Sequence, residues 1–219
     1  MDTKQFWKLI EEARSQVPAP DNGDAVAERA ATLLALRPAQ EIVAAQQALW
    51  GLMADSYRAP VWGAAYVING GCSDDGFDYF RGWLITQGRE TCERVIADPD
   101  VLADLPAVRA FAADGIDIEC EEALSIAWTA HQEATGEELP NDAFTIRYPD
   151  LDPEWNFDFE DEDELGRRLP RLTELYSAAA LPHHGEGNCA PPRTPAASSV
   201  GPCRYGAMHA ATADHHHPR

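Results

Sequence analysis

The amino-acid sequence predicts an all-α protein, with a single compact multi-helix domain at residues 1–176 and a disordered tail at residues 177–219. Apolar residues recur at helical spacing through most of the first 176 residues, and runs of β-branched residues are scarce. From residue 181 onward the chain has six prolines, four glycines and almost no branched aliphatic residues. Such a composition cannot bury enough apolar surface to offset chain entropy, so we expect the tail to be disordered.

Three helices are expected at the N-terminus. The first follows an Asp-Thr pair at residues 2–3, which supplies an N-cap, and ends before Pro18. The second covers residues 26–36 and stops near Pro38, and the third covers residues 39–57. The inward-facing stripes of the first and third helices consist of Phe6, Leu9, Ile10, Ala13, Ile42, Leu49 and Met53.

The central segment is rich in small and aromatic residues. Residues 61–68 are apolar but few, so they form either a buried helix or a strand. Gly70 and Gly71 interrupt this run, and Ser73 then caps a helix that ends at Gly88. We expect Phe77, Phe80 and Leu84 of this helix to face inward.

Four more helices are expected, at residues 90–97, 106–113, 119–135 and 161–176. Residues 143–148 alternate weakly between apolar and polar side chains, which is typical of a short strand, and the fold has room for one minor β-hairpin there.

The charge of the chain excludes several classes of partner. Thirty-seven acidic residues against 17 Lys and Arg give a formal net charge of −20. Such a surface repels phosphate backbones and anionic membranes, so we expect neither direct nucleic-acid binding nor membrane binding. A basic protein partner or a divalent cation fits the charge better, and high solubility is the simpler explanation, which we favour. The sequence leaves the oligomeric state open.

Cysteine usage and the N-terminus both favour a cytoplasmic protein. The five cysteines are odd in number and have unmatched spacings, so Cys72, Cys92 and Cys120 are expected to be buried free thiols. The first residues contain no basic region followed by an apolar one, so we expect no signal peptide. No apolar run approaches the length of a transmembrane helix.

The central motifs resemble a bacterial family known as domain of unknown function 4240. They read WGAAYVI at residues 62–68 and GGCSDDGFDYFRGWLI at residues 70–85, with FWKLI at residues 6–10. The resemblance extends over residues 1–176. It implies no catalytic residues that could be assigned to this chain.

The motif GGCSDDG at residues 70–76 is the candidate functional site. Its two glycines allow unusual backbone angles, and it places a thiol, a hydroxyl and two carboxylates at the start of a helix. The carboxylates could bind a divalent cation if Glu121 and Glu122, with Asp78 as a further contributor, converge on them. No other cofactor is predicted. The structural alternative is an N-cap with acids that complement the helix dipole. The candidate residues are Gly70, Gly71, Cys72, Ser73, Asp74 and Asp75.

A cysteine nucleophile at Cys72 would need a base, and His131 is the one histidine before the tail. Its place between Ala130 and Gln132 is typical of a partly exposed surface residue, which argues against Cys–His chemistry. The tail holds the other six histidines without a recognisable zinc spacing.

Residues 137–164 form an acidic stretch with twelve acids and one basic residue, Arg147. Trp155, Phe157 and Phe159 alternate with these acids and could dock a basic, apolar partner. The alternative is a solvated acidic loop that the three aromatic side chains pin to the domain.

Two classes of function therefore stay open. The sequence favours a non-catalytic module that binds or regulates through protein contacts, because it contains no phosphate loop, zinc signature or catalytic triad. A divalent-metal-dependent hydrolase that uses Asp74, Asp75, Glu121 and Glu122 is the second hypothesis, so enzymatic activity is left undecided.

Overall fold

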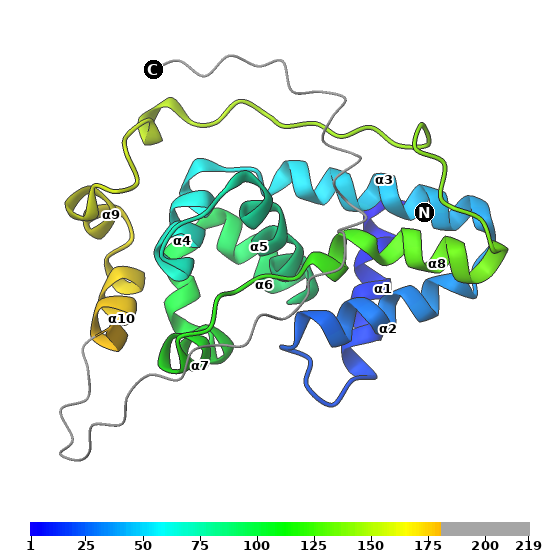
Figure 1. Ribbon diagram of the computed structural model, residues 1–219, viewed down its shortest axis with the longest axis horizontal. Helices are drawn as coiled ribbons and strands as arrows, with labels where there is room; N and C mark the ends of the chain where they lie inside the picture. The colour runs from blue at the N-terminus through cyan, green and yellow to red at the C-terminus, as the bar shows by residue number, and fades with distance from the viewer. Residues whose placement is uncertain (181–219) are drawn as a thin grey trace, which may run out of the picture. The chain divides into compact units, whose positions relative to one another are not determined.

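A computed structural model describes residues 1–180 as ten α-helices and three short 3-10 helices, with no β-strand in that part of the chain (Figure 1). The predicted all-α class is confirmed; the predicted disorder of residues 181–219 lies outside the described residues. The elements are α1 (Thr3–Ser15), α2 (Gly23–Ala35), α3 (Ala39–Asp55), α4 (Ala59–Asn69), α5 (Asp74–Thr86), α6 (Arg89–Ala97), η1 (Pro99–Asp104), α7 (Pro106–Asp114), η2 (Glu121–Ser125), α8 (Ile126–Thr135), η3 (Pro153–Trp155), α9 (Glu162–Arg168) and α10 (Pro170–Ala180).

Helix α5 lies at the centre of the fold. Nine of its residues between Phe77 and Thr86 are buried, including Trp83 and the charged pair Asp78 and Arg81. A helix that is apolar on most of its circumference is buried on all sides. Helices α2, α3, α4 and α6 and the 3-10 helix η2 all contact α5.

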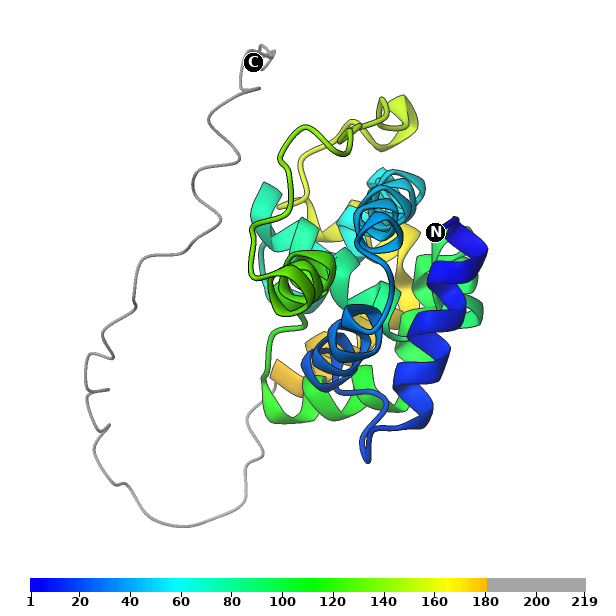
Figure 2. The same cartoon turned by 90° about the vertical axis from the view of Figure 1, so that its right-hand side faces the viewer.

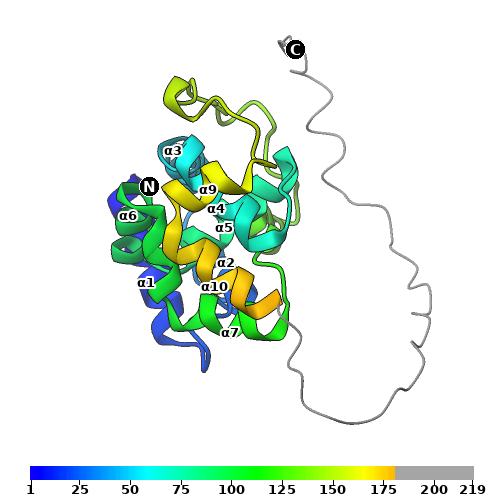
Figure 3. The same ribbon diagram turned by 90° about the vertical axis from the view of Figure 1, so that its left-hand side faces the viewer.

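Two groups of helices surround this centre. On one side, which Figure 2 faces, helices α1, α2 and α3 contact one another and α8 packs on α2 and α3. Helix α10 contacts α4, α7, α9 and η1 on the other side, which Figure 3 faces. Helix α10 continues to Ala180, beyond the domain boundary predicted at residue 176.

The short apolar run at residues 61–68 is helical rather than extended, because it lies inside α4. Pro60 in the first turn and Gly70 at the C-cap, with φ 63°, mark its ends as helix boundaries. The predicted caps of α1 and α5 are confirmed: Asp2 accepts a hydrogen bond from the amide of Gln5, and Ser73 accepts one from the amide of Gly76.

Two helices that were predicted as continuous are each divided in the structure. The predicted helix at residues 119–135 starts as η2 and becomes α8 only at Ile126, because the amide of Cys120 donates to the carbonyl of Tyr79 (3.0 Å) and holds the preceding chain extended against α5. The predicted helix at residues 161–176 breaks into α9 and α10 at Pro170. Proline lacks the amide proton that helix continuation requires, and it moves the preceding residue out of the helical region.

The strand predicted at residues 143–148 is not formed. This part of the chain pairs with a side chain instead: the amide of Thr145 donates to Gln47 Oε1 (2.8 Å), and Gln47 Nε2 donates to the carbonyl of Thr145 (3.3 Å). One glutamine side chain thus takes the place that a second strand would occupy, so no hairpin exists among the described residues.

Candidate functional site

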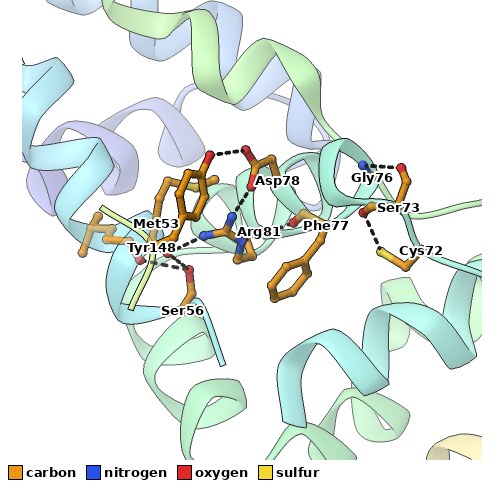
Figure 4. A network of polar contacts seen from close by, with 10 residues as sticks. Met53, Ser56, Cys72, Ser73, Gly76, Phe77, Asp78, Arg81 and Tyr148 are labelled. Atoms are coloured by element: carbon orange, nitrogen blue, oxygen red, sulfur yellow. Dashed lines mark hydrogen bonds and ion pairs between the residues drawn. The ribbon is translucent and has the colours of Figure 1, made fainter. Parts of the chain in front are cut away.

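The GGCSDDG motif is a tightly held turn between α4 and α5. Ser73 Oγ accepts from the amide of Gly76 (3.1 Å), and Trp62 Nε1 donates to the carbonyl of Cys72 (3.2 Å). Asp74 and Asp75 occupy the first turn of α5 and are exposed. Figure 4 shows the Ser73 cap directly beside Cys72. Ser73 therefore caps α5, and Asp74 and Asp75 lie where carboxylates complement the helix dipole.

The thiol of Cys72 is not activated. It is half-buried rather than fully buried, and its Sγ lies 3.6 Å from the carbonyl of Ser73. Burial, with a smaller contribution from Asp74 and against the charge of Arg81, raises the pKa of Cys72 to about 12, so the thiol stays protonated at neutral pH.

His131 is buried, which corrects the prediction of an exposed surface residue. Its Nδ1 lies 2.9 Å from the carbonyl of Glu137, and Thr135 Oγ1 is 3.3 Å from the same nitrogen. The histidine thus links the end of α8 to the backbone of Glu137.

The acidic residues predicted to converge do not form one group. Asp74 and Asp75 lie at the start of α5, whereas Glu121 and Glu122 lie in η2. Within residues 1–180, the set of possible metal ligands that come together consists of Asp24, Cys120 and Glu122, whose ligand atoms lie within 4.8 Å of one another.

The electrostatics of this second set oppose ionisation of the Cys120 thiol. Burial, a hydrogen bond that the thiol donates to the Asp24 carboxylate, and the charge of Asp24 all raise the pKa of the Cys120 thiol. Burial raises the pKa of Glu122, and the charge of Asp24 adds to this. The Cys120 thiol would have to lose its proton before it could bind a metal ion.

A buried arginine, Arg81 of α5, joins α5 to α3. The guanidinium of Arg81 forms an ion pair with Asp78 and donates to the carbonyl of Met53, while Nε lies 3.4 Å from the carbonyl of Phe77 (Figure 4). Burial lowers the pKa of Arg81, and Asp78 opposes this shift. The donors of the fully buried group thus face acceptors, as a desolvated charge requires.

Aromatic rings enclose this guanidinium. Its carbon lies 4.6 Å from the ring centre of Phe77 and 5.0 Å from that of Tyr57. Trp62 stacks on Phe77 with ring centres 4.6 Å apart. Tyr148 closes the cluster: its ring lies 5.1 Å from Tyr57 and its hydroxyl donates to Asp78 (3.3 Å).

Tyr148 belongs to an extended segment that we call the strap, residues 137–161, which runs over α3 from α8 to α9 (Figure 1). The strap is pinned at several points along its length. Leu139 is buried, Phe144 meets Trp128 edge-on (6.2 Å), Thr145 pairs with Gln47, and Tyr148 reaches Asp78.

The three aromatic residues proposed as a partner surface serve as further pins. Trp155 packs on Gly63, where a Cβ would lie 2.9 Å from the ring, and Phe159 lies 5.8 Å from Tyr66. The guanidinium of Arg168 lies 4.8 Å from Trp155 and 4.9 Å from Phe157. All three rings are half-buried, as expected of a solvated acidic loop attached by its aromatic residues.

Residues 1–133 match the family described as protein of unknown function (DUF4240), which is more than half of the chain. The chain belongs to this family. The resemblance seen in the sequence is confirmed over this range, which is shorter than the predicted 1–176. No curated protein and no solved structure matches the chain.

The DUF4240 match ends within α8, so the strap, α9 and α10 follow it in sequence. The ring of Tyr148 therefore adds a contact from outside the matched range to an arginine centre inside it. None of the α-helices in the described part of this DUF4240 protein is long and apolar enough to cross a membrane.

Sequence reasoning missed Arg81, Tyr57 and Tyr148. A signal for Arg81 was present, because it lies one turn after Phe77 and three residues before Leu84, on a face that is otherwise apolar. A charged residue on such a stripe implies a buried partner. Tyr148 had no such signal, since its contact with Asp78 spans 70 residues.

Proposed function

We propose that this DUF4240 protein is a non-catalytic binding module that recognises a basic protein surface through the strap. One observation carries the proposal: residues 145–154 are exposed without interruption, although pins on both sides hold the segment on the domain. An exposed segment that is held in place loses less conformational entropy on binding than a free loop.

The charge of the strap supports a basic partner. Its 25 positions include nine acidic residues and one arginine, a net formal charge of −8. Complementary charge accelerates encounter and selects partners, and a negative strap repels nucleic acid and anionic membranes. A cytoplasmic location is part of the proposal, and the free thiols Cys72, Cys92 and Cys120 support it.

The experiment measures binding of a lysine-rich peptide by fluorescence anisotropy at low salt. We compare wild type with the strap variant Asp150→Asn/Asp152→Asn/Glu154→Gln. The matched control, Glu12→Gln/Glu28→Gln/Glu90→Gln, removes the same charge from exposed helix positions. We expect the strap variant to bind at least about tenfold more weakly, or about 1.4 kcal/mol, and the control to bind nearly as wild type. Equal weakening by both variants would show nonspecific attraction to net charge and would refute the proposal.

The second candidate function is a divalent-metal-dependent hydrolase, for which the structure suggests a different set of metal ligands from the one predicted. Its support is the convergence of Asp24, Cys120 and Glu122, since Asp74 and Asp75 lie apart from them. A metal at 100 times its dissociation constant would add about 2.7 kcal/mol to stability. We expect no such gain with magnesium, manganese, calcium or zinc. A gain that Glu122→Gln abolishes and Asp74→Asn retains would favour this second function.

A further inference from the structure

The strap contains a short extended segment whose backbone is unpaired. Among the interactions of the described residues, none involves the backbone amides or carbonyls of residues 146–151. The segment is bounded by the Thr145–Gln47 pair and by Asp152, whose carbonyl accepts from the amide of Trp155. Tyr148 and Asp152 each precede a proline, which favours the extended conformation at both.

The Gln47 contact determines which edge of the segment faces the domain. Both backbone groups of Thr145 point to Gln47, as a residue in a strand points both groups to one neighbour. In an extended chain the direction alternates, so residues 147 and 149 share that edge. Residue 149 is a proline, and its missing amide proton falls on the edge that faces the domain.

The opposite edge has the donors and acceptors of a free strand. Ile146, Tyr148 and Asp150 each have an amide proton and a carbonyl, and none of the three is a proline. The apolar side chains here are accessible: Ile146 is 38% exposed, Tyr148 48% and Leu151 37%. An exposed strand edge with apolar side chains is a template for pairing with another chain.

We propose that the outward edge at Ile146, Tyr148 and Asp150 binds its partner by β-strand addition, and that the partner strand is a basic, extended polypeptide with alternating apolar residues. This rests on the proposed function and specifies how the same strap recognises its partner. Main-chain hydrogen bonds would supply affinity, while the exposed side chains and acids would supply selectivity.

Charge decides between a basic partner and a second copy of this chain. Asp150, Asp152 and Glu154 lie on or beside the edge, with Arg147 as the basic residue of the strap. Pairing two copies would bring these acids close to one another, and like charges on adjacent strands are destabilising. A lysine-bearing strand would instead place opposite charges across the new pair.

The test uses the full chain and a nine-residue peptide of alternating lysine and valine. A second peptide has the same sequence with N-methyl groups on its central amides, so that charge and side chains stay and the donors are lost. The protein variants are Ile146→Pro, which removes an outward amide proton, and the matched Arg147→Pro, which removes one on the edge facing the domain. Amide exchange of the wild type, measured by NMR with and without peptide, gives a readout that needs no variant.

We expect at least tenfold weaker binding for the N-methylated peptide and for Ile146→Pro, and no weakening for Arg147→Pro, which also removes a positive charge from the strap. The amides of Ile146, Tyr148 and Asp150 should exchange more slowly with peptide, while those of Arg147 and Leu151 should not. If both peptides bound equally and the peptide slowed amide exchange at none of these positions in particular, strand addition would be overturned. The charge-based proposed function would still stand. Absence of binding by either peptide at low salt would overturn both.

Discussion

Asp78 and Arg81 illustrate how a buried charge is tolerated at the level of single residues. A carboxylate, two backbone carbonyls and two aromatic rings surround the guanidinium of Arg81. These groups replace most of the interactions with water that the guanidinium loses on burial. Because the pair is desolvated, either member alone is more harmful than neither.

We therefore expect Arg81→Met to destabilise the protein by about 3–5 kcal/mol, because the buried carboxylate of Asp78 would lose its ion-pair partner. The double variant Asp78→Leu/Arg81→Met should cost clearly less than the sum of the two single changes. Urea unfolding of the wild type, the two single variants and the double variant gives the four free energies of a double-mutant cycle. Additive costs would mean that the two side chains do not depend on each other.

Glu122 allows a test of electrostatics at a second residue. Glu122 is exposed, but partial desolvation of its carboxyl raises its pKa above the ordinary 4.5, so the unfolded chain loses this proton at lower pH than the folded protein does. The contribution of Glu122 to stability is therefore greatest when it is protonated in both states. It falls as pH rises above 4.5 until the folded residue is ionised.

Glu122→Gln should consequently gain stability relative to wild type between pH 5 and pH 8. Denaturant unfolding of both proteins at the two pH values measures this difference. The exposed Glu28→Gln variant serves as control and should show little change. A constant difference between Glu122→Gln and wild type at both pH values would contradict the raised pKa.

At the scale of elements, the strap depends on close packing against α4. Gly63 leaves room for the Trp155 ring, and a Cβ at this position would come within 2.9 Å of it. The same glycine weakens α4, because glycine is about 1 kcal/mol less favourable than alanine inside a helix. The contact with the strap thus explains a residue that helix propensity disfavours.

Gly63→Ala should therefore destabilise the wild type by about 1 kcal/mol, since overpacking outweighs the gain in propensity. In a Trp155→Ala background, the same change should stabilise by about 1 kcal/mol. Gly51→Ala is the control, because nothing lies within 4 Å of its added Cβ, and it should stabilise in both backgrounds. Thermal unfolding measures each of these stability changes. If Gly63→Ala destabilised both the wild type and the Trp155→Ala variant, contact with Trp155 could not be the reason for its cost.

For the whole molecule, the net charge of −20 opposes the compact state. Salt screens repulsion between exposed charges over about 10 Å at 0.1 M. We expect the melting temperature to rise by about 2–4 °C, or about 1 kcal/mol, between 20 and 300 mM NaCl. The variant Glu12→Gln/Glu28→Gln/Glu90→Gln should have a higher melting temperature at 20 mM NaCl, and its melting temperature should rise less with salt. A fall with salt would indicate that ion pairs outweigh the repulsion.

The sequence by itself determined the all-α class, most helix positions and the caps, because hydrophobic period and capping chemistry act over a few residues. Asp2 and Ser73 were identifiable as caps, and Gly70 as a helix end, from their immediate neighbours. Pro170 was also visible, and the break that it causes between α9 and α10 could have been predicted.

Only the tertiary structure decided which distant residues meet. Glu122 joins Asp24 and Cys120 rather than Asp74, and Tyr148 reaches Asp78 across 70 residues. Residues 143–148 lack a partner strand because a glutamine side chain takes that place. Such pairings depend on how whole helices pack around α5, and local periodicity does not contain that information.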